Sequence, residues 1–288
     1  MKKILCFLLA LVLFLPLHIL PVRAETLIGG EGSGIINILL IGQDNRENEE
    51  IPRSDCMILC SFRPAEKNIT FVSFLRDLYV PIPGHRDNRI NAAYALGGMP
   101  LLKQTLQENF HLSIDGCIGV DFANFPRIID TLGGVTLTLR QDEADAINKA
   151  VEGDLTEGTQ QLTGDQALAY SRIRNLDTDG DFSRTLRQRR LLSSLLSRYR
   201  ESNLLTILSA VLDTLPMLST DMEKKQFLLL AAKLFPLLED PTVTSLRIPA
   251  DGTYAYSTIR NMEVLTADMD QARQLLRERL LSSTENDF

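Results

Sequence analysis

Three apolar stretches in the first third of the chain constrain the fold most, because charged residues stand at their ends and none in their middles. The runs cover residues 38–41, 56–62 and 69–75, and the adjoining polar groups are Gly42-Gln-Asp44-Asn-Arg46, Arg53-Ser-Asp55 and Arg76-Asp77. Short apolar runs bounded by polar residues are typical of buried β-strands. Open α/β sheets build binding sites at strand ends. The pattern therefore predicts an α/β sheet with a charged site along one edge.

A second group of charged residues lies between residues 170 and 188. If residues 172–174 are extended, Arg172 and Arg174 point to one face and Ile173 points to the core. A helix that follows, capped by Asp181 or Ser183, places residues 184, 187 and 188 on one side. Guanidinium groups that converge repel one another, and their planar fork suits phosphate oxygens. The alternative is a surface charge run with scattered salt bridges.

Carboxylates accompany these arginines in the upstream motifs. Asp44 and Asp55 can form simple ion pairs, or they can hold a cation. Mg²⁺ takes one or two carboxylates together with substrate phosphates. Two aspartates among several arginines therefore also fit a Mg²⁺–pyrophosphate site.

The order of these motifs resembles the LytR-CpsA-Psr (LCP) family. The resemblance runs from about residue 35 to 200, and more weakly to about 280, with small departures at Gln43 and Phe74-Leu75. It rests on the three groups above and on Arg89-Ile-Asn91-Ala-Ala-Tyr94, Gly133-Gly-Val135, Tyr170-Ser-Arg172-Ile-Arg174 and Gly180-Asp-Phe-Ser-Arg184-Thr-Leu-Arg187-Gln188. Several blocks in the same order are more specific than any one of them.

The resemblance implies an extracytoplasmic phosphotransferase. Such an enzyme moves a glycopolymer, for example teichoic acid or capsule, from an undecaprenyl-pyrophosphate carrier to a hydroxyl of peptidoglycan, with Mg²⁺ as cofactor. The arginine and aspartate set of the family is complete in this chain. Two other classes stay open: a non-catalytic regulatory protein that binds polyprenyl phosphates, and a hydrolase of lipid pyrophosphates.

The resemblance also implies roles for individual residues. Asp44 and Asp55 hold Mg²⁺. The pyrophosphate is bound by Arg53, Arg76, Arg89, Arg172, Arg174 and Gln188. Arg76, Asp181 and Arg184 take part in catalysis, and either Asp181 or an aspartate released from the metal accepts the proton of the acceptor hydroxyl.

Residues 1–25 are expected to be a membrane anchor or a signal peptide. Lys2 and Lys3 precede an apolar run of 17 residues, 4–20, which is at the lower limit for a spanning helix. The positive end belongs in the cytoplasm, whereas Val22-Arg-Ala24 is also compatible with cleavage. Either case exports the domain. We expect a flexible linker at residues 26–34 and the catalytic domain at residues 35–283.

Composition excludes several classes of protein. The formal net charge of −7 argues against nonspecific nucleic-acid binding. Cys56 and Cys60 are about 13 Å apart if they lie on one strand, too far for a disulfide. A buried free thiol is expected at Cys117, with pairing to one of these two as the alternative. No cysteine spacing indicates zinc.

Together with the LCP resemblance, the pattern leads us to expect a single three-layer α/β domain whose central mixed β-sheet is flanked by helices. Residues 140–160 are polar and are expected to be a mobile flap or a loop with some helix. Thr163 to Gln166 fits a capping box. Two apolar helical stretches, 204–215 and 225–237, are expected either to cover a groove for a polyprenyl tail or to be plain core. Strands are expected at 242–249 and 259–265 around an Asp251-Gly252 turn, and a last helix at 267–281.

Overall fold

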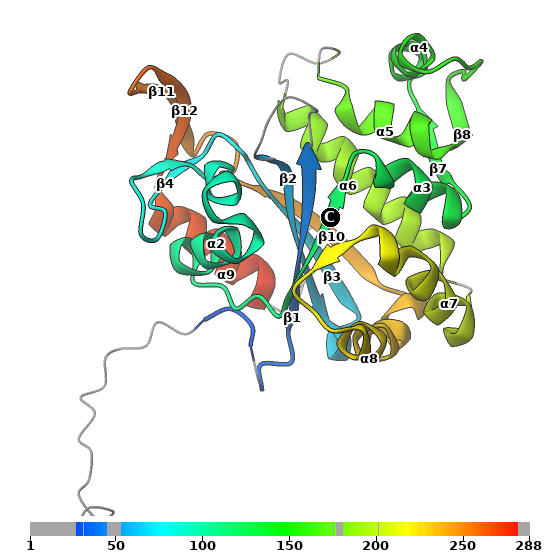
Figure 1. Cartoon of the computed structure of the whole chain (residues 1–288), viewed down its shortest axis with the longest axis horizontal. Helices are drawn as coiled ribbons and strands as arrows, with labels where there is room; N and C mark the ends of the chain where they lie inside the picture. Colours follow the sequence, from blue (N-terminus) through cyan, green and yellow to red (C-terminus); the bar gives the residue numbers. More distant parts are fainter. Residues whose placement is uncertain are drawn as a thin grey trace, which may run out of the picture.

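The computed structural model describes residues 27–30, 32–44, 53–174, 176, 181–200 and 202–281, with the backbone alone at Asp44, Arg53 and Asp181. In this part of the chain, six strands form a central sheet in the order β10-β3-β2-β1-β6-β9 (Figure 1). Their bounds are β1 (Ile36–Asp44), β2 (Arg53–Arg63), β3 (Asn68–Phe74), β6 (Gly116–Asp121), β9 (Ser219–Thr220) and β10 (Thr242–Ile248). Two neighbouring pairs are parallel (β1 with β6, β3 with β10), and the other pairs in the sheet are antiparallel. The predicted mixed sheet is confirmed.

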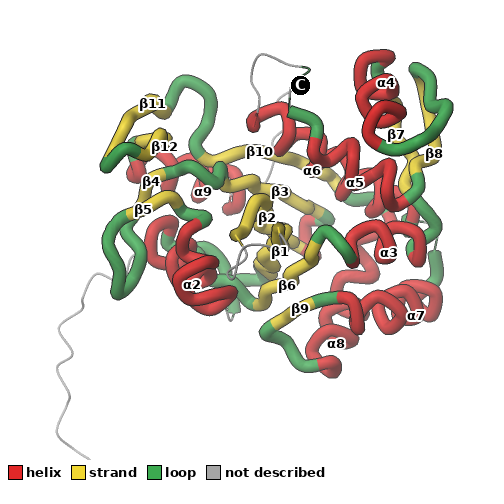
Figure 2. The backbone as a smooth tube through the Cα atoms, turned by 45° about the horizontal axis from the view of Figure 1, so that its top comes forward, coloured by secondary structure: helices red, strands yellow, loops and turns green. Residues whose placement is uncertain are grey.

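Helices cover both faces of this sheet, which confirms the three layers. Figures 1 and 2 show α2 and α9 on one side and α3, α5, α6, α7 and α8 on the other. The helices are α2 (Ala92–Phe110), α3 (Asn124–Thr131), α4 (Gln141–Ala150), α5 (Gly164–Arg172), α6 (Asp181–Arg198), α7 (Leu204–Thr214), α8 (Lys224–Leu234) and α9 (Met269–Leu281). Short 3-10 turns are η1 (Pro64–Glu66), η2 (Leu215–Met217) and η3 (Phe235–Glu239).

The two-residue period of the central strands supplies apolar groups to both helical layers. On β2, Leu59 belongs to the core under α2 and α9, which also contains Leu106 and Phe110. Its neighbour Ile58 packs in the opposite cluster, together with Phe71 and the Leu192 side chain of α6. Strands covered on both faces read as nearly continuous apolar runs, which explains the sequence pattern.

Residues 140–160 contain a helix, as one of the two expectations had it, and also the start of a strand. The segment forms α4 and the start of β8 (Gly158–Leu162), which pairs antiparallel with β7 (Val135–Leu139). Ala144 and Ile147 of α4 are fully buried in a second core that includes Tyr170 of α5. The polar composition is misleading because α4 buries one narrow face and exposes the rest.

The last strands also differ from expectation. Asp251-Gly252 does not join two paired strands; it leads from β10 to a separate hairpin of β11 (Tyr254–Ile259) and β12 (Met262–Ala267). The hairpin turns at Arg260 and Asn261, both with positive φ (52° and 60°). Arginine is unusual in that conformation, so the sequence gives only a weak indication of a hairpin turn at this position. A smaller hairpin pairs β4 (Tyr79–Val80) with β5 (Asn88–Arg89).

Part of the expected linker is packed against the domain. Ile28 is 1% exposed and forms a β-bridge with Leu112. Gly29 has φ 98°, and a Cβ atom there would lie 2.3 Å from Asn37 Nδ2. Residues 1–25 lie outside the described residues. Among the helices that the structure describes, none is both long and apolar enough to cross a bilayer.

Candidate functional site

A β-bulge sets the position of Asp55 at the edge of the sheet. Gly42 pairs with Cys56 and Gln43 pairs with Ser54, so Asp55 is the extra residue of β2 at the shift in register. A bulge turns a side chain out of the regular alternation and often lies beside a functional site. The same ladder ends at Asp44 paired with Arg53, whose backbones therefore lie next to Asp55. The side chains of Asp44, Arg53 and Asp181 lie outside the described atoms.

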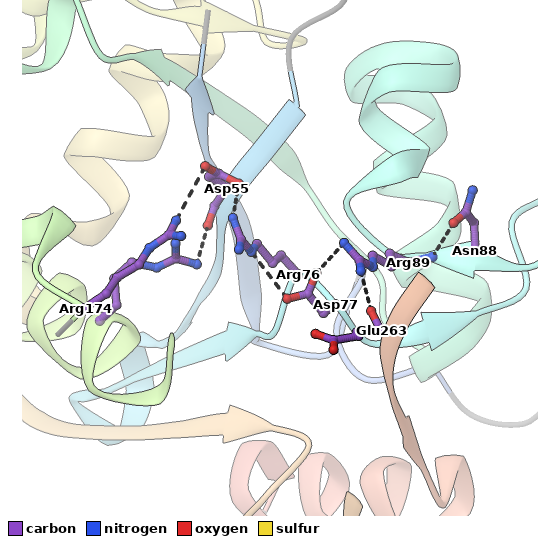
Figure 3. Close-up of polar contacts among 8 residues, drawn as sticks. Asp55, Arg76, Asp77, Asn88, Arg89, Arg174 and Glu263 are labelled. Carbon is purple, nitrogen blue, oxygen red and sulfur yellow. Dashed lines mark hydrogen bonds and ion pairs between the residues drawn. The ribbon is translucent and has the colours of Figure 1, made fainter. Parts of the chain in front are cut away.

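Three arginines contact Asp55, and Figure 3 shows two of them, Arg76 and Arg174. Arg76 Nη1 lies 2.9 Å from its Oδ1, and Arg174 Nη2 lies 3.9 Å from its Oδ2. Arg184 Nη2 donates to the backbone carbonyl of Asp55 at 3.3 Å. These residues come from β2, from the turn after β3, from the end of α5 and from α6. Positive charge thus exceeds negative charge at Asp55 among these four side chains, which suits an anionic ligand.

The charge pattern continues from Arg76 to the β11–β12 hairpin. Arg76 Nε lies 3.5 Å from Asp77 Oδ2, and Arg89 Nη1 lies 3.2 Å from Asp77 Oδ1. Arg89 Nη2 also donates to the backbone carbonyl of Glu263. Arg89 is therefore joined to the Asp55 cluster through Asp77. The sequence motif contained Asp77, but only the structure shows that it bridges the two arginines.

Arg172 and Arg174 do not alternate on a strand, so that expectation is wrong. Helix α5 begins at the predicted capping box, in which Thr163 Oγ1 accepts from Gln166 N and Gln166 Oε1 accepts from Thr163 N. The helix continues through Arg172, so this residue is helical and not extended. Arg174 then reaches Asp55, whereas the Arg172 guanidinium lies 4.9 Å from the centre of the Phe122 ring. Ile173 packs against the second core, as expected.

Helix α6 presents different residues to different surroundings. Arg184 is 4% exposed beside Asp55, and Gln188 lines an apolar cavity. Arg187 does not reach the site; its Nε donates to Glu143 Oε1 of α4 at 2.8 Å. The three residues thus share one side of the helix less closely than their spacing suggested. No local signal in the sequence links Arg187 with a glutamate 44 positions away.

An apolar cavity of about 130 Å³ adjoins the arginine cluster. It lies between β1, β2 and β6 of the sheet and helices α3, α5 and α6, and its walls include Ile58, Phe122, Phe125, Leu168, Leu191 and Leu195. No residue of 204–237 is among the walls of this cavity. Helices α7 and α8 contact each other, and α7 also contacts α3; the groove or plain core expected at residues 204–237 stays a prediction. Cys56 also lines the cavity, and burial raises the pKa of its thiol to about 12, so the sulfur stays protonated and is a poor nucleophile at neutral pH.

A wider cavity of about 660 Å³ lies on the other side of Arg172 and Arg174. Ala146 and Ala150 of α4 and Ala169 of α5 form part of its wall. Arg172 therefore borders this space and also lies over the Phe122 ring, which lines the narrow apolar cavity.

The described residues contain no group of three or more His, Cys, Asp or Glu side chains placed to hold a metal. Cys56, Cys60 and Cys117 are free thiols, which confirms the expectation that they do not pair. Asp55 offers hard carboxylate oxygens, and the backbone of Asp44 lies on the neighbouring strand.

Comparison with known proteins identifies relatives of this chain. The chain is 36% identical over 203 residues to the polyisoprenyl-teichoic acid–peptidoglycan teichoic acid transferase TagU of Oceanobacillus iheyensis, covering 67% of this chain and 62% of the relative. It is 34% identical over 167 residues to the regulatory protein MsrR of Staphylococcus aureus, covering 57% of this chain and 49% of the relative. The matches thus span less than two thirds of each relative.

Structural similarity extends further along the chain than these alignments. The LytR-CPS2A-psr family protein YwtF (TagT) with bound octaprenyl pyrophosphate lipid is similar with a TM-score of 0.67 and 26% sequence identity, over 90% of this chain and 95% of that chain. The family model for LytR_cpsA_psr matches residues 22–278. These matches agree with the mixed sheet and with the arginine cluster around Asp55. The chain belongs to the LytR_cpsA_psr family.

Proposed function

We propose that this protein transfers a glycopolymer from an undecaprenyl-pyrophosphate carrier to a hydroxyl of peptidoglycan on the outer side of the cell membrane. The observation that carries the proposal is the grouping of Arg76, Arg174 and Arg184 around Asp55, whose neighbour in the chain, Cys56, lines an apolar cavity. One ligand that needs both environments is a pyrophosphate joined to an isoprenoid chain. The names of the TagU and TagT relatives agree with this class of substrate.

The arginines perform the electrostatic part of the reaction. The acceptor oxygen attacks the phosphorus that bears the sugar, the bond from this phosphorus to the bridging oxygen breaks, and polyprenyl phosphate leaves. The acceptor proton passes to a carboxylate of the cluster. Arg76 and Arg174 neutralise the charge that grows on the leaving phosphate, and preorganised donors of this kind lower the barrier strongly.

In the free protein, the negative charge of Asp55 occupies the place beside Arg76 that the substrate's phosphate would take. Its carboxylate, 14% exposed, keeps Arg76 in place at 2.9 Å before the pyrophosphate binds. Arg76 in turn is braced by Asp77, which Arg89 contacts from the other side. In the free protein, Arg89 therefore supports Arg76 through Asp77. For Arg89 itself to bind the pyrophosphate, as the family resemblance implies, its guanidinium must release Asp77.

The residues also fit Mg²⁺, which remains part of the proposal. Mg²⁺ is usually bound by one or two carboxylates and completed by substrate phosphates and water. Asp55 and Asp44 would be the protein ligands. When bound, the ion would neutralise phosphate oxygens and orient the pyrophosphate. A site of this kind does not need a larger carboxylate cluster in the protein.

The apolar cavity would receive the first part of the lipid chain. Phe122 lies between Arg172 and the cavity walls, so the polar and apolar parts of the substrate would separate at this ring. The wider cavity beside Arg172 and Arg174 would then receive the sugar end. Residues 1–25, outside the described residues, would keep the domain at the membrane in which the carrier is dissolved.

The test follows release of lipid phosphate by the full chain in detergent with Mg²⁺, a short lipid-pyrophosphate-linked saccharide and, in one arm, peptidoglycan fragments. The matched variants are Asp55→Ala and Asp145→Ala, because Asp145 is an exposed aspartate of α4. Release that requires both the acceptor and Asp55 supports the transferase. Release without acceptor would show a hydrolase, and binding without release would show a regulatory binder; either result contradicts the proposal.

A further inference from the structure

A third cavity, a cleft of about 320 Å³, lies on the face of α6 that points away from Gln188. It is bounded by β7 and β10, two strands that each have one edge unpaired within the described part of the sheets. Its lining includes Thr136, Thr138, Arg189, Arg190, Ser193 and Ser245. On a period of 3.6 residues, Arg190 and Ser193 lie about 140° or more around the helix from Gln188. The cleft is thus separate from the apolar cavity.

The wall of this cleft contains a buried arginine with incomplete partners. Arg189 is 7% exposed; its Nη1 donates to Ser73 Oγ at 2.8 Å, and its Nε has no hydrogen-bond partner. No carboxylate among the described residues forms an ion pair with it. A buried charge without a counter-charge is costly, and such groups are ordinarily paired.

A second arginine increases the excess of positive charge. Burial, and then the charge of nearby Arg247, lowers the pKa of Arg189 to about 10. Arg247 stacks over the Phe182 ring at 4.0 Å and pairs with Asp251, whose side chain is 86% exposed. The charge of Arg247 is therefore partly neutralised by Asp251 on the solvent side. Among the described residues, the hydrogen-bond partner of the Arg189 guanidinium is the neutral hydroxyl of Ser73.

A purely structural role explains this arrangement poorly. The Arg189–Ser73 hydrogen bond ties α6 to β3, but a neutral donor would do so without burying a charge. Arg190, Ser193 and Ser245 line the cleft together with Arg189, and no acidic side chain is among its lining residues. Guanidinium forks with hydroxyl donors are the groups that bind tetrahedral oxyanions.

We propose that this cleft is a second anion site, which binds a phosphate-class oxyanion between Arg189 and Arg190. The anion supplies the missing counter-charge. Two sources carry this chemistry: a phosphodiester in the glycopolymer itself, which is the source we infer, and free inorganic phosphate. The choice of the glycopolymer as the source of the phosphodiester rests on the proposed function. The proposal that the cleft binds an anion does not.

The first experiment observes arginine Nε–H signals by NMR in the full chain, with inorganic phosphate added at constant ionic strength. The Arg189 signal, identified from the Arg189→Lys variant, should shift saturably. Arg190→Gln should weaken phosphate binding about fivefold, because a charge-assisted contact is lost, while Arg127→Gln, at an exposed arginine of α3, should leave it unchanged. An equal shift with chloride, or loss of the shift in Arg76→Ala, would overturn the site.

The second experiment separates the two sources by steady-state transfer. With a donor that contains phosphodiesters, Arg190→Gln should raise KM about fivefold and leave kcat unchanged, and with an uncharged donor it should change neither. An unchanged KM with the charged donor, together with phosphate binding by NMR, would overturn the polymer and leave free phosphate as the source. The NMR titration needs no turnover, so failure of the anion site and failure of the proposed function are distinguishable.

Discussion

Arg187 and Glu143 form a buried ion pair between α6 and α4, with Nε and Oε1 2.8 Å apart and side chains 3% and 1% exposed. Arg187 Nη1 also donates to the carbonyl of Ile173 at 3.4 Å, next to Arg174. The pair therefore connects the segment predicted as a flap with the helix that carries Arg184 and Gln188. It holds the positions of site residues that it does not touch.

Removing Glu143 should destabilise the domain because it leaves Arg187 charged and unpaired in the interior. We expect Glu143→Ala to lower the free energy of unfolding by about 3 kcal/mol or more, measured by urea denaturation. Asp142→Ala, at a neighbouring residue whose side chain is 46% exposed, should change it by about 0.5 kcal/mol or less. Equal effects of the two variants would contradict a structural role for the buried pair.

Arg76 should matter for transfer more than for folding, since its side chain is 23% exposed at the edge of the sheet. Arg76→Ala should raise the barrier by about 3 kcal/mol, roughly a hundredfold in kcat, with Arg127→Ala as the control arginine.

Arg174→Ala should reduce transfer more than Arg172→Ala, because Arg174 reaches Asp55 and Arg172 faces Phe122. Unimpaired transfer in the Arg172→Ala, Arg174→Ala double variant would refute the site.

The capping box at the start of α5 should contribute measurably to stability. Thr163→Ala removes the oxygen that accepts from Gln166 N, and we expect a loss of about 1 kcal/mol in urea denaturation. Thr163→Ser keeps the oxygen and should stay close to the wild type. If serine and alanine behave alike, the hydroxyl does not cap the helix.

Asp221 gives a pH dependence with a defined sign. Burial acts to raise the pKa of its carboxyl, but hydrogen bonds from Lys103 Nζ (2.8 Å) and Cys117 N (2.7 Å) outweigh burial and lower it. With the pKa lower in the folded state, Asp221 stabilises the protein above its ordinary pKa of 3.8 and loses this effect as the pH falls through the folded value. The stability difference between wild type and Asp221→Asn should therefore shrink below about pH 4. A difference that grows with acidification would contradict this.

Much of the site could be predicted because its residues lie at the ends of strands that follow one another in the chain. Antiparallel pairing of β1, β2 and β3 brings Asp44, Asp55 and Arg76 to one edge whatever the details of packing. Arg184 joins them from a helix that the sequence also indicated. The order of the motifs then identified the family.

The sequence by itself determined the strands, most helices and the charged edge, since these depend on local periodicity and on capping groups such as Thr163. Tertiary structure decided which arginine meets which partner: Arg174 meets Asp55, Arg172 meets Phe122, and Arg187 meets Glu143. It also ordered α4, placed the apolar cavity beneath α6 and enclosed Arg189. The physical reason is that these outcomes depend on packing between segments tens of residues apart, and no local pattern encodes which charged groups such packing buries together.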